Sequence, residues 1–423
     1  MVRNIVRVGR RGKGQERGDE REAGVERAIQ KLDSRVELIQ TLIPLGLEAV
    51  NDVLQQEVTA LAGERYRRAG GQPGYARWGQ QRGSVFLADQ KVAVQVPRVR
   101  DLAREQEIPL ATYQSLREPR RADEAAMRKI LKGLSCRDYE SCAEPVAETF
   151  GLKASSLSRR FKRASAKKLS ELTERDLSGY DLVALFLDGK TFGDDEMVIA
   201  LGITLEGEKV ILGFVQTGTE NEAVCSAFLR GLMERGLKTG QGVLCVIDGA
   251  KGLRKAVNKV FGDQAAVHRS QWHKRENVVR YLPTGEQPVY RRKLQAAYEQ
   301  PTYAKAKAAL TRVRTELTKL NASAVNSLDE GLEETLTLHR LGLIKELGRS
   351  FKTTNCLENL NSLVGQRTDK VDYWRNSDQK QRWLATPLLD IEPRLRLVSG
   401  HKQLIRLRAA LQTHLKGYLS EVA

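Results

Sequence analysis

Apolar and polar positions in the N-terminal part of the chain predict a helical region followed by a β-hairpin. Residues 1–25 are charged and show no period, which predicts a flexible arm. Apolar positions then recur at helical spacing over 28–62, with a break expected near Pro44. Residues 84–96 alternate between apolar and polar, which predicts a hairpin that ends at Pro97.

Two short apolar runs later in the chain each end in an aspartate. DLVALFLD ends in Asp188, and VLCVID ends in Asp248. Apolar runs of this length predict strands buried on both faces, and α/β sheets bind ligands at the carboxyl ends of such strands. The two aspartates together therefore suggest a pair of metal-binding carboxylates. Either aspartate taken alone is better explained as a cap of the turn or helix that follows it.

The segments around these runs predict a mixed sheet. Further strands are expected at 197–204, 209–217 and 265–268, and helices at 220–236 and 249–261. This order of strands and helices indicates a mixed α/β sheet and not a Rossmann repeat. No GxGxxG or GxxxxGK[ST] motif occurs, so nucleotide binding is not indicated. The pattern is helical again over most of 278–350, at 353–365 and from 372 to the end.

Composition and charge point to a polyanionic partner. The chain has 423 residues, of which 70 are Lys or Arg and 53 are Asp or Glu, so its formal net charge is +17. This length predicts two or three domains, and this charge favours nucleic acid as the partner. No apolar run approaches the length of a membrane span, so no membrane association is expected. The five cysteines show no CxxC spacing, which fits a reducing compartment and a cytoplasmic, nucleoid-associated location.

Residues 138–164 match the pattern of a helix-turn-helix. A first helix is expected to end at Phe150, Gly151 would make the turn, and a second helix would begin at Ala154 or Ser155. Hydroxyl and arginine side chains near the start of the second helix suit contacts to phosphates and base edges. The candidates for DNA contact on this helix are Ser156, Ser158, Arg159, Arg160 and Arg163.

A second candidate for DNA contact precedes the hairpin. Residues 65–83 are basic and rich in glycine, with aromatic side chains interleaved. Arginines in such a segment can contact phosphates while the aromatic rings stack. Tyr75, Arg77 and Trp78 are the candidates there. The alternative is an ordinary polar loop whose aromatic residues fold back on the domain.

Two carboxylates need a third to hold divalent cations for phosphodiester chemistry. Such ions activate the nucleophile and stabilise the leaving oxygen, and Mg²⁺ prefers oxygen ligands. Glu358 is the best candidate because it opens a helix directly after a polar turn. Alternatively, Asn355 caps that helix and Glu358 completes a capping box. The acidic cluster at 194–196 is a competing source of ligands, although it fits the tip of a hairpin.

Several motifs taken together resemble a known family. They are LDGKTF at 187–192, VIDGAKGL at 246–253, HRSQWHKRENVVRYLP at 268–283, TTNCLENLN at 353–361 and WRNSDQKQRWLATPLLDIEPRLR at 374–396. Their order and spacing resemble bacterial Mutator-type insertion-sequence transposases, from roughly residue 60 to the end. The resemblance implies a DDE catalytic centre on an α/β ribonuclease H-like core with a mixed sheet. An all-helical insertion would interrupt this core, and a mostly helical N-terminal region with the helix-turn-helix would bind DNA.

The resemblance also assigns roles to residues. Asp188, Asp248 and Glu358 would be catalytic and would hold two Mg²⁺ or Mn²⁺ ions. His273 matches the histidine of the family's Cys-x-x-His signature, and Ser270 stands at its cysteine position. A metal role for that pair is therefore doubtful, and a hydrogen-bonding or structural role for His273 stays open. Trp272, Lys274, Arg275, Asn277 and Arg382 would contact DNA. Trp383 would either do the same or pack between helices.

The function implied is that of a DNA transposase. It would bind terminal inverted repeats, cleave double-stranded DNA and join the 3′ hydroxyl ends to target DNA, acting as a homodimer. A non-catalytic DNA-binding regulator derived from a transposase is one alternative, and a structure-specific nuclease on the same fold is another. The expected segments are 1–120 for DNA binding or dimerisation, 121–175 for the helix-turn-helix, 180–277 and 351–423 for the two parts of the core, and 278–350 for the insertion.

Overall fold

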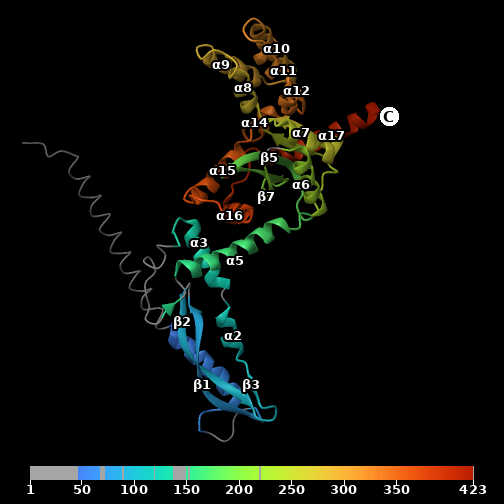
Figure 1. The fold of residues 1–423 in the computed structure, drawn as a ribbon. Helices are drawn as coiled ribbons and strands as arrows, with labels where there is room; N and C mark the ends of the chain where they lie inside the picture. Colours follow the sequence, from blue (N-terminus) through green and yellow to red (C-terminus); the bar gives the residue numbers. More distant parts are fainter. Residues whose placement is uncertain are drawn as a thin grey trace, which may run out of the picture. The chain divides into compact units, whose positions relative to one another are not determined.

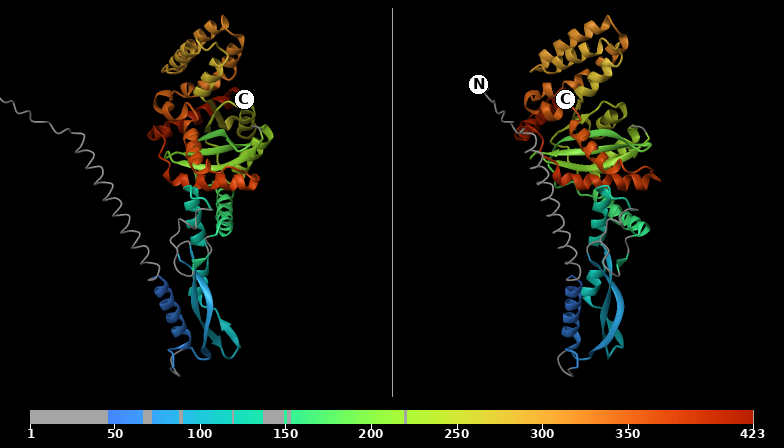
Figure 2. Two further views of the ribbon diagram at one scale, coloured as in Figure 1. Left: turned by 60° about the vertical axis from the view of Figure 1, so that its left-hand side comes forward. Right: turned by 90° about the vertical axis from the view of Figure 1, so that its left-hand side faces the viewer.

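The computed structural model describes residues 46–66, 72–87, 90–118, 120–136, 149–150, 153–218 and 221–422. The chain divides into two compact units (Figure 1, Figure 2). The first comprises 1–130 with 134–161, and the second comprises 131–133 with 162–423. The expected arm over 1–25 lies outside the described residues, as does the part of the first helix that precedes residue 46. The division into five segments remains a prediction.

A long hairpin forms the first unit together with a helix over 46–62. Strand β1 (Tyr75–Leu87) pairs antiparallel with β2 (Gln90–Asp101). The hairpin is longer than expected, because β2 continues beyond Pro97. Pro97 lies opposite Gln80, next to a shift in register. A proline has no N–H to donate to the ladder, so an irregularity is where a strand tolerates one.

Apolar side chains from the helix and the hairpin form the core of this unit. Those that are buried are Val50, Leu54, Val58, Val85, Val94, Val96, Val99 and Leu110. The Arg77 guanidinium ties the two elements together. Its Nε donates to Gly63 O at 2.9 Å and its Nη2 to Thr59 Oγ1 at 2.8 Å. Arg77 therefore holds the hairpin against the helix.

Two short strands and three helices complete the N-terminal part. Strands β3 (Gln106–Ile108) and β4 (Thr149–Phe150) both pair with β2. The helices are α2 (Ala111–Arg117), α3 (Arg120–Leu131) and α5 (Ala154–Thr173), the last of which continues into the second unit.

Within the described residues, α5 lies where the second helix of the expected helix-turn-helix was placed. Residues 137–148, which include most of the expected first helix, lie outside the described residues. The prediction that this helix ends at Phe150 is wrong, because Thr149 and Phe150 pair with Val92 and Lys91 of β2. A β-branched and an aromatic residue suit an extended segment of this kind.

A five-stranded mixed sheet is the centre of the second unit. Its strands lie in the order β7, β6, β5, β8, β9. Their bounds are β5 Leu182–Phe192, β6 Asp195–Thr204, β7 Lys209–Thr217, β8 Val243–Ile247 and β9 Ala265–Arg269. Neighbours β5, β6 and β7 are antiparallel, whereas β8 is parallel to β5 and β9 is parallel to β8. The expected mixed α/β sheet is therefore confirmed.

Alternating side chains of β5 place a hydrophobic core on each face of the sheet. Leu185 and Leu187 contribute to the core shared with α6 (Glu222–Glu234) and α7 (Lys251–Phe261). Ala184 and Phe186 contribute to the opposite core. That core is shared with α14 (Ile344–Phe351), α15 (Asn355–Thr368), α16 (Ser377–Ile391) and α17 (Leu404–Val422). The short 3₁₀ turns are Gly262–Gln264, Glu392–Arg394 and His401–Gln403.

A group of helices between β9 and α14 has its own core. These are α8 (Gln271–Val279), α9 (Gln287–Tyr298), α10 (Tyr303–Thr318), α11 (Ala322–Asp329), α12 (Leu332–Thr335) and α13 (Thr337–Arg340). Leu294, Leu310 and Leu328 are fully buried in this core. Helices α9, α10 and α11 project away from the sheet (Figure 1). We call α9–α12 the helical segment. Among the described residues, no helix is long and apolar enough to cross a membrane.

Candidate active site

Asp188 and Asp248 occupy adjacent positions on neighbouring parallel strands. Leu187 of β5 lies opposite Ile247, the last residue of β8, so the residue that follows each of them is an aspartate. Neighbouring strands run about 4.8 Å apart, which brings the two side chains to one place. Asp188 is only 8% exposed. The expectation that Asp188 ends its strand is wrong, because β5 continues to Phe192 in its pairing with β6.

The loop after Asp248 turns sharply. Asp248 Oδ1 accepts a hydrogen bond of 2.9 Å from the N–H of Ala250. Gly249 has a φ of 114°, a conformation that side chains with a Cβ rarely adopt. Asp248 therefore does hold the turn, as the capping alternative expected, although Ala250 and not Asp248 is the N-cap residue of α7.

The start of α8 lies directly beside this loop. Ser270 N donates to Ile247 O at 2.8 Å, so Ser270 is fixed next to the residue that precedes Asp248. Ser270 is the N-cap of α8, and its Oγ lies 3.0 Å from His273 Nδ1. A serine at the cysteine position of the signature thus caps a helix and positions the histidine.

Glu358 reaches the same region from α15. Its Oε1 lies 3.9 Å from His273 Nε2 and 3.3 Å from Thr354 Oγ1. Thr354, and not Asn355, is the N-cap residue of α15, so the expected capping box with Asn355 is absent. Glu358 is the fourth residue of the helix, and its carboxylate contacts side chains of α8 and of the cap.

Helix α15 is held against the sheet on the face to which Asp188 belongs. Leu357, Leu360 and Val364 of α15 are buried in the same core as Phe186. Beyond them, Lys190 Nζ donates to Asn361 O at 3.1 Å. Asp188, Asp248 and Glu358 therefore come from β5, from the end of β8 and from the first turns of α15, three elements that pack together.

Carboxylate oxygens are the donors that Mg²⁺ and Mn²⁺ prefer, so the residue types fit a hard divalent cation. Among the described residues, however, no three His, Cys, Asp or Glu side chains gather closely enough to hold one ion. One contact joins Glu358 to His273, and the register of β5 and β8 places Asp188 beside Asp248.

The competing carboxylates have other partners. Asp195 Oδ2 accepts from Lys380 Nζ at 2.5 Å and from Gln216 Nε2 at 2.8 Å. Glu346 of α14, a further carboxylate that precedes Glu358 in the chain, pairs with Arg406 at 3.0 Å. Glu196 is the carboxylate of the 194–196 cluster that interacts with Asp248. Burial, and then the charge of Asp248, raise the pKa of the Glu196 carboxyl group.

The residues expected to contact DNA divide into exposed and buried ones. Ser158, Arg159 and Arg163 lie on the exposed face of α5, and Ser156 and Asn277 are half-buried. Trp272 and Trp78 are each 46% exposed. Trp272 packs edge-on against His273, and Arg100 lies over the Trp78 ring at 4.7 Å. These side chains are accessible to a ligand.

The buried candidates have structural partners. Arg160 is 5% exposed and its Nε bonds Asp123 Oδ1 at 3.0 Å. Lys274 is 1% exposed, and its ammonium bonds two carbonyl oxygens. Arg382 is buried and pairs with Asp378.

Three further aromatic and basic candidates also make contacts within the chain. Arg275 pairs with Glu276, Tyr75 packs on the core of the first unit, and Trp383 packs against the core of the second. Helix packing of Trp383, one of the two alternatives, is therefore confirmed.

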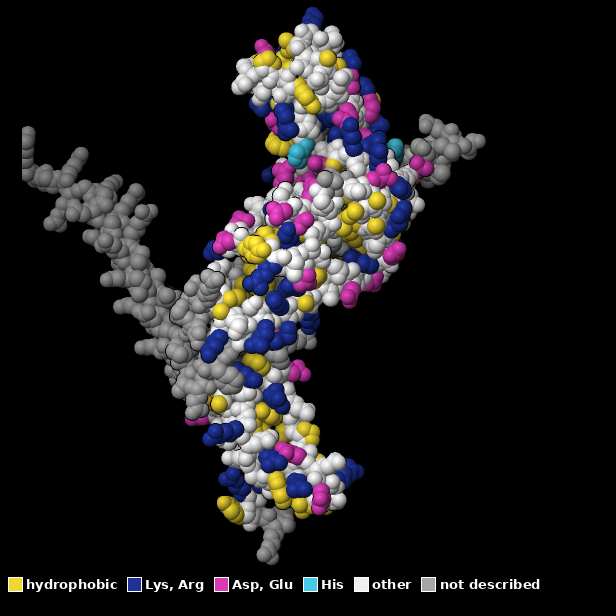
Figure 3. All heavy atoms as spheres, viewed as in Figure 1, with side chains coloured by type: hydrophobic (Ala, Val, Ile, Leu, Met, Phe, Trp, Pro, Cys, Tyr) yellow, Lys and Arg dark blue, Asp and Glu magenta, His cyan; other side chains and the backbone are white. Residues whose placement is uncertain are grey.

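Charge on the surface is mixed. On the face seen in Figure 3, Lys and Arg side chains lie over both units, and acidic side chains are interspersed among them.

Sequence reasoning missed two cations at the site, Lys190 and Arg269. Both lie inside recognised motifs, but nothing in their spacing indicates that they bond distant carbonyl groups.

Comparison with known proteins supplies the family. The chain matches the model of the family described as "Transposase, Mutator family" over residues 19–394. It is 26% identical to the transposase for insertion sequence element IS905 of Lactococcus lactis over 347 residues, which cover 80% of this chain and 85% of that protein. It is 28% identical to the transposase for insertion sequence element IS1081 of Mycobacterium tuberculosis over 409 residues, covering 91% and 92% of the two chains. The chain therefore belongs to the Mutator family of transposases.

Proposed function

We propose that this chain is a DNA transposase whose second unit is a ribonuclease H-like core with a DDE centre formed by Asp188, Asp248 and Glu358. One observation carries the proposal. Asp188 of β5 is in register with Asp248, which directly follows the neighbouring parallel strand β8, and α15, which carries Glu358, packs on the same face of the sheet. The order of the five strands and the helices on both faces support the ribonuclease H-like assignment.

Asp188, Asp248 and Glu358 are the residues that would hold two Mg²⁺ or Mn²⁺ ions. When bound, such ions activate the attacking oxygen and stabilise the leaving oxygen of a phosphodiester. Their positions on a strand, at a strand end and on a helix give the carboxylates rigid supports, which catalytic precision requires.

His273 would position Glu358 and contact the scissile strand. Ser270 and Thr354 contact the same ring nitrogen of His273, Nδ1, at 3.0 and 3.4 Å. This leaves Nε2 directed at Glu358, 3.9 Å away. An imidazole fixed in this way donates one hydrogen bond in a set direction. The geometry supports hydrogen bonding to the carboxylate or to a phosphate oxygen as its role.

DNA would be bound by the exposed cationic and aromatic side chains of both units. Arg159 and Arg163 on α5 suit phosphate contacts, and Trp272 offers an exposed ring beside the candidate centre. We further propose that two copies act together, since two element ends must be held for joining. Light scattering of the protein with and without terminal-repeat DNA tests the homodimer.

The decisive experiment combines three variants with two DNA substrates. Asp188→Asn, Asp248→Asn and Glu358→Gln are assayed with Mg²⁺ on duplexes that carry the inverted repeats flanking the gene. One duplex is uncut and the other ends in a pre-cut 3′ hydroxyl. We expect each variant to lose cleavage and joining by at least about a hundredfold, while a mobility shift shows unchanged DNA binding.

Glu346→Gln is the matched control, because Glu346 is a carboxylate of the same core that pairs with Arg406. It should cleave like the unmodified protein. Full activity of Glu358→Gln would remove Glu358 from the centre. Cleavage without any joined product from the pre-cut end would contradict the transposase and favour the nuclease.

A further inference from the structure

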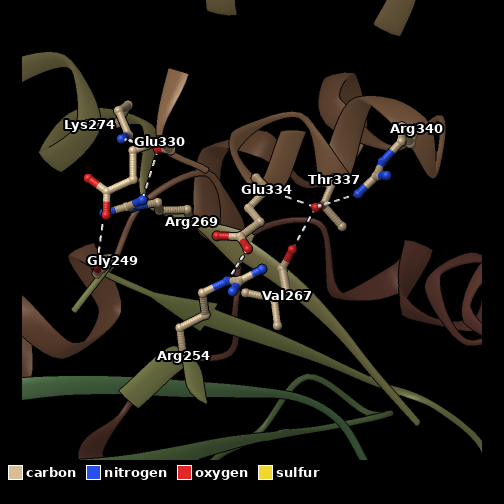
Figure 4. A network of polar contacts seen from close by, with 9 residues as sticks. All are labelled: Gly249, Arg254, Val267, Arg269, Lys274, Glu330, Glu334, Thr337 and Arg340. Atoms are coloured by element: carbon tan, nitrogen blue, oxygen red, sulfur yellow. Dashed lines mark hydrogen bonds and ion pairs between the residues drawn. The ribbon is translucent and has the colours of Figure 1, made fainter. Parts of the chain in front are cut away.

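Arg269 links the loop of Asp248 to the helical segment. Arg269 is the last residue of β9 and lies opposite Ile247 of β8, so it is adjacent to the strand end that bears Asp248. Its Nη2 donates to Gly249 O at 2.7 Å, and its Nη1 donates to Glu330 O at 3.0 Å (Figure 4). One guanidinium therefore bridges the residue after Asp248 and the turn between α11 and α12.

The backbone on both sides approaches this guanidinium closely. A Cβ at Gly249 would overlap Arg269, and a Cβ at Gly331 would lie 2.5 Å from its Nη1. Both glycines also have positive φ angles, of 114° and 67°. Glycine at each position thus permits a close approach as well as an unusual conformation. The two loops are shaped around the arginine.

The side chain is deeply buried at some energetic cost. Arg269 is 6% exposed, and its Nε has no hydrogen-bond partner among the described residues. A buried donor left unsatisfied ordinarily costs about 1–3 kcal/mol. Because this cost lowers stability, the position of Arg269 at the edge of the candidate centre is better explained by its placement of the loop at Gly249 than by stability alone.

The turn on the far side is held by further contacts. Lys274 Nζ donates to Ser327 O at 2.6 Å and also to Glu330 O, the carbonyl that Arg269 uses. Arg254 pairs with Glu334 nearby. Figure 4 shows Lys274 and Arg269 meeting at Glu330, between α11 and α12, and Arg254 meeting Glu334 of α12. Movement of this turn would therefore be transmitted to Gly249 through Arg269.

We propose that Arg269 is a positioning residue that sets the Asp248 carboxylate and makes its placement depend on the seating of the helical segment. This inference rests on the proposed function, in which Asp248 is a metal ligand. Groups that orient a metal ligand typically change metal affinity 10- to 100-fold when they are removed. The signature of the role is thus the dependence of the reaction on metal concentration.

The first test uses Arg269→Met and Arg269→Lys in the full chain. Cleavage of terminal-repeat DNA is followed as Mg²⁺ is varied, and Mn²⁺ binding is measured separately by electron paramagnetic resonance. For Arg269→Met we expect the half-saturating Mg²⁺ concentration and the Mn²⁺ dissociation constant to rise about tenfold. DNA binding should be unchanged, and Arg269→Lys, which keeps a donor, should recover part of the loss.

The second test does not change the arginine. Gly331→Ala places a methyl group against Arg269, whereas Gly342→Ala has open space around it at nearly the same φ, 68° against 67°. The two variants carry similar backbone strain, so only Gly331→Ala should weaken Mg²⁺ and Mn²⁺ binding. This pair keeps the proposal testable if Arg269→Met does not fold.

Two results would overturn the proposal. One is an unchanged Mg²⁺ and Mn²⁺ dependence in folded Arg269→Met. The other is an equal change in Gly331→Ala and Gly342→Ala. If Asp248→Asn stays active, the proposed function itself fails. If Asp248→Asn is inactive and Arg269→Met keeps normal metal dependence, only the positioning role of Arg269 fails.

Discussion

His273 Nε2 lies 3.9 Å from Glu358 Oε1, although the whole helical segment separates the two residues in sequence. The pair is formed because Ser270 is anchored to the end of β8 and α15 is packed on β5. Gln271 N also donates to Lys352 O at 2.9 Å, which joins the start of α8 to the chain just before α15. The chain before and after this group of helices is thereby brought together beside Asp248.

His273→Ala should reduce cleavage more than it reduces folding or DNA binding. The ring lies 3.9 Å from one oxygen of Glu358, and its loss would leave more room for that carboxylate to adopt other rotamers. We expect a decrease of about 10- to 100-fold in the cleavage rate at saturating Mg²⁺, measured in single-turnover assays. Thr354→Val, which removes only the hydroxyl near Glu358, should have a smaller effect in the same direction. Full cleavage activity of His273→Ala would show that Glu358 does not require the contact with His273.

Lys274 should make the unfolding free energy of the chain rise with pH in the alkaline range. Burial, and then the charge of Arg269, lower the pKa of Lys274 from 10.5 to about 8. The folded chain then binds fewer protons than the unfolded chain between about pH 8 and 10.5, so stability should rise with pH across that window. The contribution is on the order of 3 kcal/mol.

Lys274→Met removes the titrating group and should remove this rise. Urea midpoints of the unmodified protein and of the variant, measured from pH 7 to 10.5, test the difference. Lys259→Met is the control, because Lys259 is exposed and pairs with Glu222 at the surface. Parallel pH profiles for the unmodified protein and Lys274→Met would contradict the prediction.

The sheet was largely predictable because each strand is specified by residues that are consecutive in the sequence. Continuous apolar runs specify β5 and β8, and each Asp follows directly from its own run. The length of β5 was not predictable, because Gly189 and Lys190 look like the end of a strand. They remain extended because β6 pairs with them, and that pairing is set by the partner strand.

The contacts of the candidate site were predictable only in part. Residue types and order make Asp188, Asp248 and Glu358 the candidates, but they do not indicate the bonds around them. Lys190 to Asn361 and Arg269 to Gly249 join side chains to distant backbone carbonyls, which have no sequence signal. The charges of Arg160 and Lys274 suggest DNA contact in the sequence, whereas the structure buries both side chains. A charge in a basic helix indicates a ligand only when the fold leaves it exposed.

His268 should contribute to loss of stability in acid. It is fully buried in β9, and burial together with the nearby His339 lowers the pKa of its imidazole to about 3. Burial also lowers the pKa of His339, and Arg340 is the other charge that disfavours a proton on His268. The unfolded chain binds a proton below about pH 6.5 that the folded chain excludes, so stability should fall as pH decreases from 6.5 towards 3.

His268→Leu should flatten this fall. The unfolding free energy of the unmodified protein should fall by about 1.4 kcal/mol more than that of the variant for each pH unit below 6.5. Thermal midpoints measured between pH 7 and 4 should therefore decrease less steeply for the variant. His414→Gln serves as the control, because His414 is exposed on α17. An identical acid dependence of His268→Leu and the unmodified protein would show that other groups control the transition.

Arg159 and Arg160 are consecutive on α5 and should behave in opposite ways. Arg159 is exposed, whereas Arg160 is buried and its Nε bonds Asp123 at 3.0 Å. Removing one partner of a buried ion pair leaves the other charge uncompensated and typically costs about 3–5 kcal/mol. Arg160→Ala should therefore unfold the first unit at lower urea concentration, while Arg159→Ala should leave that midpoint unchanged.

DNA binding measured at several salt concentrations separates the two roles. If Arg159 contacts a phosphate, Arg159→Ala should weaken binding and reduce the slope of log affinity against log salt by about 1. Arg160→Ala should leave the slope unchanged for the fraction that remains folded, because a buried guanidinium releases no counterion from DNA. A reduced slope in folded Arg160→Ala would mean that α5 rearranges on binding DNA and exposes this side chain.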